Sequence, residues 1–186
     1  IRRQAEVLDG LTDRTIVVTG YRGDEVEAHL SGSRVTTVES GLCGGYVYLG
    51  KGRDSGSGPG GFRHFLILPV DYPLVTRSLI EDLIEEFHHS GAPVLYPSFS
   101  MRKGHPPVIS PPAFRIYCLI RAMRTKRSTD TINSEAEYFS AEDETCIIDM
   151  DTPEDYKKVL ALEAGLHQGF SLPPGNVSSD KRPRDN

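Results

Sequence analysis

The sequence predicts an α/β fold of three layers (α/β/α), in which helices cover both faces of a mixed, mostly parallel sheet. Short apolar and β-branched runs alternate with segments of helical periodicity along the chain. Two of the runs, within residues 65–75 and 145–156, stop at an aspartate, meet a proline within two residues and then open a helix. We therefore expect acidic side chains at the carboxyl edge of the sheet, where open α/β sheets bind ligands.

The expected elements follow in a regular order. The chain opens on part of an amphipathic helix, residues 2–11. The predicted strands are short runs bounded by turn residues, at 14–21, 34–40, 65–71, 92–99 and 145–150, with an ambiguous strand at 46–49 and a short one around Tyr138. The later helices are predicted at residues 24–30, 78–87, 113–123 and 154–164.

Capping residues mark where three of these helices begin. Asp24 is expected to cap the second helix, and Ser78 with Glu81 to form the capping box of the third. Thr152 and Asp155 form a similar pair at the start of the last helix. The core face of the third helix is predicted from apolar residues at helical spacing, namely Leu79, Ile80, Leu83, Ile84 and Phe87.

Residues 1–166 are predicted to form one domain, and residues 167–186 a disordered tail. The glycine- and serine-rich segment 50–61 is expected to be a mobile surface loop. The polar segment 124–144 is expected to be mostly loop. Because no capping residue precedes the opening helix and the chain starts at Ile1, we expect that the native N-terminus lies upstream.

The composition narrows the class of protein. A hydrophobic share of 38% with 25% charged residues is ordinary for a globular domain, and the net charge of −5 argues against a nucleic-acid partner. No segment is long and apolar enough to predict a membrane span or a signal peptide. The cysteines Cys43, Cys118 and Cys146 are isolated, which argues against disulfides and structural zinc and favours a cytoplasmic location.

Asp71, Asp149 and Asp151 are the candidate metal ligands. Mg²⁺ is usually held by one or two carboxylates together with substrate phosphates, and Asp71 with Asp149 or Asp151 supplies that set. Asp151 has an alternative explanation, because an aspartate before a helix is often only a cap or turn residue. Asp71 lacks such a role, since the helix that follows it has its own cap. Phosphate chemistry is therefore the leading hypothesis.

His105 is the candidate substrate contact. Gly104 before it and two prolines after it stiffen the backbone, so that the turn presents the imidazole to a ligand. A purely structural turn histidine is the alternative. His88 and His89 are adjacent on a helix and point about 100° apart, which makes them a poor metal pair.

Two familiar motifs are excluded. Residues 45–51 have the spacing G-x-x-x-x-G-K of a phosphate-binding loop, but Gly52 stands where that loop needs Ser or Thr for Mg²⁺. The sequence also contains no G-x-S-x-G elbow for a serine hydrolase.

Three segments in this order and spacing, "LPVDYPLV", "RKGHPPVIS" and "IIDMDTPEDY", resemble the MobA/MocA-like nucleotidyltransferases of molybdenum-cofactor biosynthesis. The similarity extends over about residues 1–166. It implies a GT-A-like Rossmannoid fold. The first strand of that fold and its glycine-rich, lysine-containing phosphate loop do not precede Ile1 in this sequence.

The resemblance implies transfer of a nucleotidyl group from an NTP, CTP or GTP, to the terminal phosphate of a molybdopterin, with release of pyrophosphate and with Mg²⁺ as cofactor. By motif, Asp71 would be the principal Mg²⁺ ligand and Asp149 or Asp151 would lie near the same ion. Gly104 and His105 would line the acceptor side. Molybdoenzymes undergoing maturation would be protein partners.

Three departures from the family pattern leave alternatives open. The phosphate loop is missing before Ile1, and Gly44 and Gly45 stand where relatives have hydroxyl residues. The Gly/Asp-containing segment that often follows the "GHP" motif is not recognisable in residues 114–133. The parent protein is therefore expected to be the enzyme, and the present chain alone is expected to be catalytically compromised. A sugar- or alcohol-phosphate nucleotidyltransferase is one alternative. A non-catalytic homologue that acts as a binding module is the other.

Overall fold

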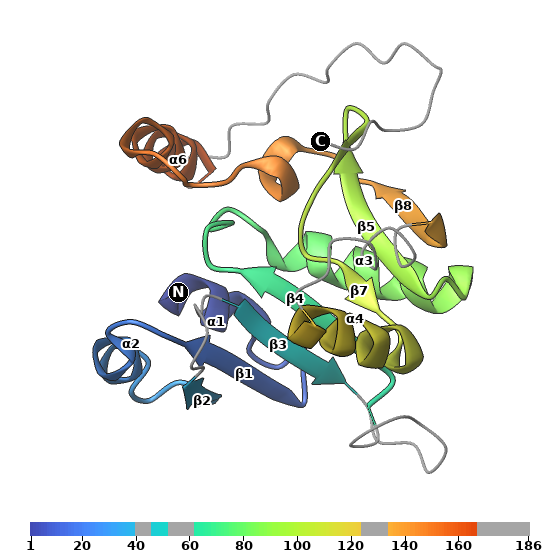
Figure 1. The fold of residues 1–186 in the computed structure, drawn as a ribbon. Coiled ribbons are helices and arrows are strands. Elements are labelled where there is room, and N and C mark those ends of the chain that lie inside the picture. The colour runs from blue at the N-terminus through green and yellow to red at the C-terminus, as the bar shows by residue number, and fades with distance from the viewer. Residues whose placement is uncertain (40–45, 52–61, 124–133, 167–186) are drawn as a thin grey trace.

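A computed structural model describes residues 1–39, 46–51, 62–123 and 134–166 of the 186-residue chain. The strands are β1 Arg14–Thr19, β2 Val35–Glu39, β3 Tyr46–Lys51, β4 His64–Pro69, β5 Val94–Phe99, β6 Arg102–Lys103, β7 Val108–Ile109 and β8 Ala136–Ser140. The helices are α1 Arg2–Leu8, α2 Gly23–His29, α3 Arg77–Ser90, α4 Pro111–Met123, the 3₁₀ helix η1 Glu144–Ile147, and α6 Pro153–Leu166. Figure 1 shows their arrangement.

The strands form one mixed sheet in the order β2-β1-β3-β4-β7-β5-β6, and β8 pairs with β5. The β1–β2 and β5–β8 pairs are parallel, and the other pairs are antiparallel. It follows that β1, β2, β4, β5 and β8 run in one direction, and that β3 and the two-residue strands β6 and β7 oppose them. This confirms the predicted mixed sheet in which most strands share a direction.

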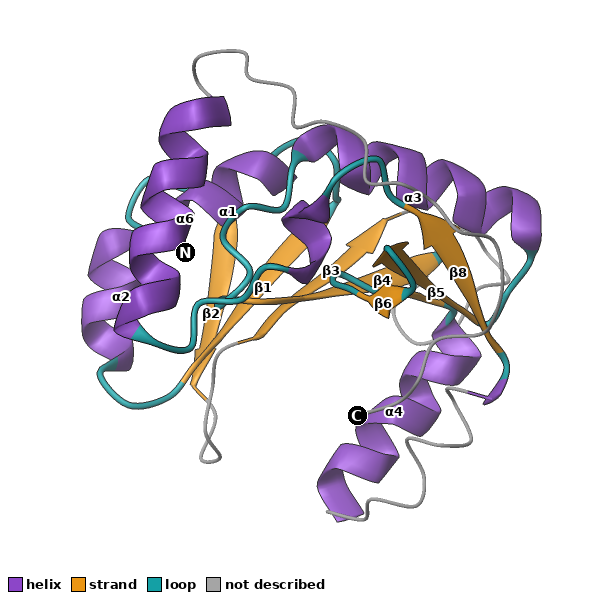
Figure 2. Cartoon of the chain, turned by 90° about the horizontal axis from the view of Figure 1, so that it is seen from above, coloured by secondary structure: helices purple, strands orange, loops and turns teal. Residues whose placement is uncertain are grey.

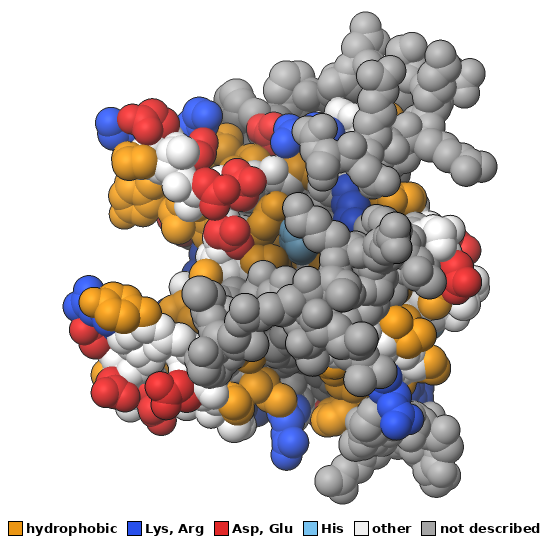
Figure 3. Space-filling view, in the orientation of Figure 1, with side chains coloured by type: hydrophobic (Ala, Val, Ile, Leu, Met, Phe, Trp, Pro, Cys, Tyr) orange, Lys and Arg blue, Asp and Glu red, His pale blue; other side chains and the backbone are white. Residues whose placement is uncertain are grey.

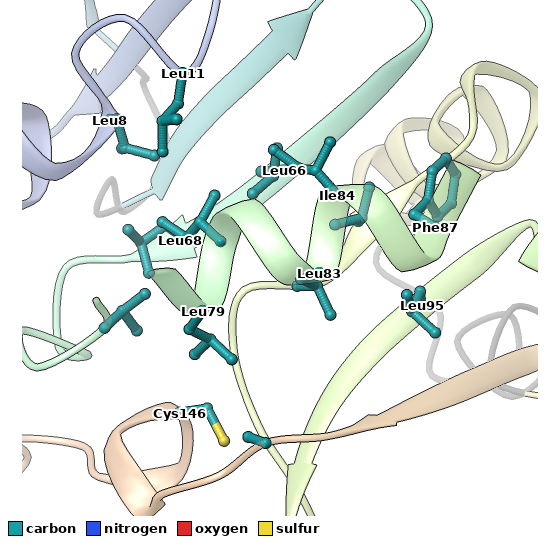
Figure 4. Close-up of a cluster of buried hydrophobic side chains, with 14 of the residues drawn as sticks. Leu8, Leu11, Leu66, Leu68, Leu79, Leu83, Ile84, Phe87, Leu95 and Cys146 are labelled. Atoms are coloured by element: carbon teal, nitrogen blue, oxygen red, sulfur yellow. The ribbon is translucent and has the colours of Figure 1, made fainter. Parts of the chain in front are cut away.

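Helices cover the sheet on both faces. Figure 2 shows α1, α3 and α6 over one face and α4 under the other. The side chains of β4 alternate accordingly: Leu66 and Leu68 pack in the cluster beneath α3, and Ile67 packs in a second cluster with Ala113 of α4. All six residues of β4 are buried, as expected for a strand covered on both faces. Figure 4 shows side chains of this cluster around α3, with Leu79 and Leu83 on the helix and Leu66 and Leu68 on β4.

The predicted core face of α3 is confirmed, since all five of its apolar residues are buried. The predicted cap is wrong. Thr76 precedes the helix with an extended backbone, and its hydroxyl accepts a hydrogen bond from the amide of Leu79 at 3.3 Å. Ser78 already lies in the first helical turn. Both residues carry a hydroxyl, so the side chain alone did not distinguish them, and the backbone conformation decides which one caps the helix.

Two further predictions differ from the structure. Asp24 does not cap α2, which begins at Gly23 after a left-handed Arg22 without a side-chain cap. Residues 145–147 of the predicted strand 145–150 lie instead in the 3₁₀ helix η1, where the Asp143 carboxylate accepts a hydrogen bond from the amide of Thr145 at 2.9 Å, and residues 148–150 belong to no strand. The neighbouring edge of β5 is already occupied by β8, so this segment has no strand to pair with there.

The capping box of α6 is confirmed: the Asp155 amide donates to the Thr152 hydroxyl at 3.2 Å, and the Thr152 amide donates to the Asp155 carboxylate at 3.1 Å. Within the predicted loop 50–61, residues 50 and 51 belong to β3. The rest of that loop, Gly44 and Gly45, residues 124–133 and the predicted tail 167–186 lie outside the described residues.

Among the described helices, none combines the length and the apolar character needed to cross a membrane.

The Thr76 cap gives a direct test of how α3 begins. We expect Thr76→Ala to lower the free energy of unfolding by about 1 kcal/mol, because the Leu79 amide loses its partner. Ser78→Ala is the matched control, and it should cost less than about 0.5 kcal/mol. Urea unfolding of both variants measures the difference. The reverse order of the two effects would show that Ser78 caps the helix.

Candidate functional site

Asp71 lies in a tight turn directly after β4. The amide of Tyr72 donates to the carbonyl of Pro69 at 3.3 Å, which closes the turn. The side chain of Gln4 on α1 donates to the carbonyls of Pro69, at 2.8 Å, and Tyr72, at 3.1 Å, and so holds the turn on both sides of Asp71. One carboxylate oxygen of Asp71, Oδ1, is buried and has no hydrogen-bond partner in the described part of the chain. The backbone on both sides of Asp71 is thus held in place, and one oxygen of its carboxylate has no partner among the described residues.

The segment between β6 and β7 brings Gly104 against the 3₁₀ turn η1. The Gly104 amide donates to the carbonyl of Pro97 at 2.7 Å, and the His105 amide donates to the carbonyl of Cys146 at 2.8 Å. A Cβ atom at position 104 would lie 2.5 Å from the Cys146 carbonyl oxygen, so only glycine fits. Close packing therefore explains Gly104. Its expected contact with an acceptor stays a prediction.

His105 follows this contact and precedes a cis peptide bond to Pro106. Its ring centroid lies 4.5 Å from that of Tyr72, and its Nδ1 is buried without a partner among the described residues. Burial, with a smaller contribution from the charge of Lys103, lowers the pKa of His105 to about 4. The imidazole is therefore neutral at physiological pH, and it can give or accept a hydrogen bond without carrying charge.

Asp149 and Asp151 are exposed on the extended stretch between η1 and α6. The capping box that starts α6 uses Thr152 and Asp155, so the Asp151 carboxylate is not its cap. Burial is the largest cause that raises the pKa of Asp71, and the charges of Asp151 and Asp149 raise it further, while a hydrogen bond from its own amide lowers it. The structure thus brings the three aspartates within electrostatic reach of one another.

Tyr72 experiences the same negative charges. Its pKa rises to about 12, first because of burial and then because of Asp149, Asp71 and Asp151, while Arg102 acts in the opposite direction. The hydroxyl therefore stays protonated beside the acidic groups. Figure 3 shows acidic side chains gathered beside a hollow that opens between α6 and α2.

Arg102 is a functional candidate that the sequence analysis missed. It is paired with Phe99 across the β5–β6 hairpin, and opposed residues of an antiparallel pair project to the same face. Phe99 and Tyr72 both pack against the core cluster beneath α3, so Arg102 projects to the face that carries Tyr72. Lys103 projects the other way, with its Nζ 3.9 Å from the centre of the Tyr96 ring. Within the described residues, Arg102 forms no ion pair.

The acidic site meets the minimal requirement for a divalent cation. In the described residues, no group of three or more His, Cys, Asp and Glu side chains is arranged to hold a metal ion. Mg²⁺ needs fewer protein ligands than that, because it retains water and binds substrate phosphates. The unpartnered oxygen of Asp71, and the rise that the charges of Asp151 and Asp149 cause in the pKa of its carboxyl, fit such a site, because a cation would relieve the repulsion.

The acidic groups lie beyond the carboxyl end of β4, which is the general position of ligand sites in open α/β sheets. A family model described as "MobA-like NTP transferase domain" matches residues 1–132. The chain belongs to this family, and membership indicates nucleotidyl transfer as its general activity.

Solved structures support the fold. One is a homologue of Mycobacterium tuberculosis Rv0371c from Mycobacterium sp. strain JC1, with a TM-score of 0.58, 22% identity, and coverage of 83% of this chain and 77% of that chain. Another is Rv0371c of M. tuberculosis H37Rv, with a TM-score of 0.57, 16% identity, and coverage of 86% and 82%. The same protein in complex with manganese gives a TM-score of 0.57 at 14% identity, with coverage of 86% and 85%. No curated protein matches the chain.

The partly buried His105 should make stability depend on pH. Its pKa is about 4 in the folded protein against an ordinary 6.5, so the unfolded chain binds more protons between these values. Its contribution to the free energy of unfolding is therefore complete above pH 6.5 and is lost as the pH falls toward 4. We expect His105→Phe to flatten this dependence in urea unfolding.

His89→Gln is the matched control, because it removes an exposed histidine from α3. A wild-type pH slope in His105→Phe would contradict the burial of a neutral imidazole at position 105.

Proposed function

We propose that the protein transfers a nucleotidyl group from an NTP, CTP or GTP, to the terminal phosphate of a molybdopterin and releases pyrophosphate. The observation that carries the proposal is that the charges of Asp149 and Asp151 act on the Asp71 carboxyl and raise its pKa. One buried oxygen of that carboxyl also has no hydrogen-bond partner among the described residues. Membership of the NTP transferase family gives the reaction class. The molybdopterin acceptor and the maturing molybdoenzymes as partners come from the sequence resemblance.

The proposed cofactor is Mg²⁺, with Asp71 as principal ligand and Asp149 or Asp151 as the second. Bound there with the triphosphate, the ion would neutralise phosphate charge and align the reacting groups. The manganese complex of Rv0371c shows that a protein of this fold binds a divalent cation. The donor set here is also of the type that suits Mg²⁺ and Mn²⁺, since it consists of carboxylates.

The reaction needs no protein nucleophile. An oxygen of the acceptor phosphate attacks the α-phosphorus of the NTP, the bond between the α-phosphorus and the bridging oxygen breaks, and pyrophosphate leaves with that electron pair. The protein residues position the groups. Neutral His105 and protonated Tyr72 offer uncharged hydrogen bonds on the acceptor side. Arg102 offers a positive charge for a phosphate of either substrate.

A pyrophosphate-release assay tests the proposal. With Mg²⁺, CTP or GTP and molybdopterin, we expect release by the full-length wild-type protein and a loss of about 100-fold or more in Asp71→Asn, because the principal metal ligand is removed. Asp82→Asn, which removes an exposed acid from α3, is the matched control and should keep wild-type activity.

A screen of sugar and alcohol phosphates in the same assay distinguishes the acceptors. If pyrophosphate were released only with a sugar or alcohol phosphate, that compound would replace molybdopterin as the proposed acceptor. No release with any combination of NTP and acceptor would favour a non-catalytic binding module.

Arg102 and Lys103 form a matched pair, since they are adjacent and project to opposite faces. Arg102→Gln should raise the KM for one phosphate-bearing substrate by about 10- to 100-fold, which corresponds to one lost charged hydrogen bond. Lys103→Gln should change KM by less than about threefold, and its effect should fall on stability, at about 0.5–1 kcal/mol, through the contact with Tyr96. Equal KM effects would exclude the assigned role of Arg102.

A further inference from the structure

Two adjacent residues of α1 contact the Asp71 turn and the helix that follows the Asp149–Asp151 stretch. Gln4 donates to the carbonyls of Pro69 and Tyr72, at 2.8 and 3.1 Å, on either side of Asp71. Arg3 forms an ion pair with Glu163 of α6 at 2.5 Å. Helix α6 begins directly after the stretch that bears Asp149 and Asp151. One turn of α1 thus connects two regions that are far apart in the sequence.

We propose that Arg3 and Gln4 are positioning residues that set the separation between the Asp71 turn and the Asp149–Asp151 stretch. Neither residue needs to touch a ligand. They would act by holding the two groups of carboxylates at the distance at which one divalent cation can be shared. This inference rests on the proposed function, because it presupposes that the aspartates bind a cation.

The attachment of Gln4 to the Asp71 turn is strong. Its side chain is buried at 2% exposure, and its two donated bonds go to carbonyls on either side of Asp71. Its own Oε1 has no partner in the described residues. Burial of a polar group costs free energy unless the group is hydrogen-bonded, so the two donated bonds have to offset that cost. A buried glutamine with an unpartnered oxygen lowers stability, so it is expected where the geometry that its two donated bonds fix is needed for function.

Helix α1 is itself held firmly, as a spacer must be. Ala5 and Leu8 are buried in the core cluster beneath α3. At the end of the helix, the guanidinium of Arg77 on α3 donates to the carbonyl of Asp9 at 2.9 Å. Because α1 is held in place by these contacts, Arg3 and Gln4 can in turn hold the segments that they contact.

The attachment of α6 is weaker, which makes Glu163 the sensitive point. Val159 is buried, but Tyr156 and Leu160 are 52% and 47% exposed. In the described part of the chain, the contact with Arg3 is the only ion pair between α6 and another element. Both partners are about one-third exposed, at 33% and 34%, and such pairs contribute only about 0–1 kcal/mol to stability. Loss of the pair should shift α6 without unfolding the protein.

An effect of these contacts on metal affinity can therefore be separated by experiment from an effect on folding stability. Supporting contacts around a metal site typically change its affinity by about 10- to 100-fold, even where they contribute little to folding. Mn²⁺ is the probe, because its binding to the wild type can be followed by electron paramagnetic resonance without any other substrate. Thermal unfolding is measured on the same samples.

We expect Arg3→Gln and Glu163→Gln each to lower the Mn²⁺ affinity by about tenfold, with little change in melting temperature. The double exchange Arg3→Glu with Glu163→Arg should restore the affinity to within about threefold, because it reverses the ion pair without removing it. Arg22→Gln is the matched control, since it breaks the exposed pair that Arg22, the residue before α2, forms with Glu25 of that helix. It should leave Mn²⁺ binding unchanged.

Gln4→Met tests the other contact. It keeps the length of the side chain and removes both donors, so amide hydrogen exchange should accelerate in residues 69–75 and the Mn²⁺ affinity should fall. Glu163→Gln should accelerate exchange in residues 149–155 instead. If Gln4→Met does not fold, the Arg3 and Glu163 variants still decide the question.

The outcomes distinguish the two proposals. Wild-type Mn²⁺ affinity in the Arg3, Gln4 and Glu163 variants would overturn the positioning role and leave the metal site in place. Failure of the double exchange to restore binding would overturn the role of the ion pair. Absence of Mn²⁺ binding by the wild type would overturn the metal site itself, and the positioning role with it.

Discussion

Repulsion among like charges at the end of β4 is the constraint on which this site depends. Asp71 is partly buried in a turn after an entirely buried strand, and the charges of Asp149 and Asp151 act on it from the other side of the site. A folded protein keeps carboxylates in such a position only if other contacts hold them there. Gln4 supplies two of those contacts, and the cap of α6 leaves Asp151 unused by the helix. The repulsion between these carboxylates lowers the local stability, and the same carboxylates form a site that favours positive charge.

The groups around these carboxylates are uncharged or positive. Burial keeps His105 neutral and Tyr72 protonated, and their rings lie 4.5 Å apart. Arg102 is positive and projects to the same face as Tyr72. This arrangement suits a polyphosphate that arrives with a cation, because the anion then meets hydrogen-bond donors and one fixed positive charge. A bare carboxylate cluster would repel it.

Local patterns predicted the parts of the fold that are decided locally. The apolar run of β4 and the spacing of the five apolar residues on α3 were sufficient, because burial on both faces or on one helical face leaves a direct mark on the sequence. The segment 145–150 was misassigned because its strand-like composition says nothing about whether a partner edge is free, and β8 occupies that edge of β5. Caps depended on the backbone conformation at Thr76, which the sequence does not state.

The candidate site was also predicted only in part, because some of its residues leave a local signal in the sequence and others do not. Asp71, Asp149 and Asp151 could be named because strand ends and prolines are local signals, whereas Gln4 and Arg102 acquire their roles only through contacts between distant elements. A glutamine among the apolar residues of α1, beside Ala5 and Leu8, was the one available sign. Gly104 was named as a ligand contact, and the structure gives it a packing reason as well, because the carbonyl of Cys146 leaves no room for a side chain.

The position of β3 has a consequence for the cooperativity of the fold. The unit β1–α2–β2 is a parallel strand–helix–strand crossover, and among the strands that the structure describes only β3 joins it to β4 and the rest of the sheet. Six register pairs connect β3 to β4, and five connect it to β1. If β3 released β1, the crossover unit would lose its hydrogen bonds to the rest of the sheet, but Val17 of β1 and Leu30 at the end of α2 would still pack in the core cluster beneath α3. The crossover unit should therefore unfold together with the α3 core and not before it.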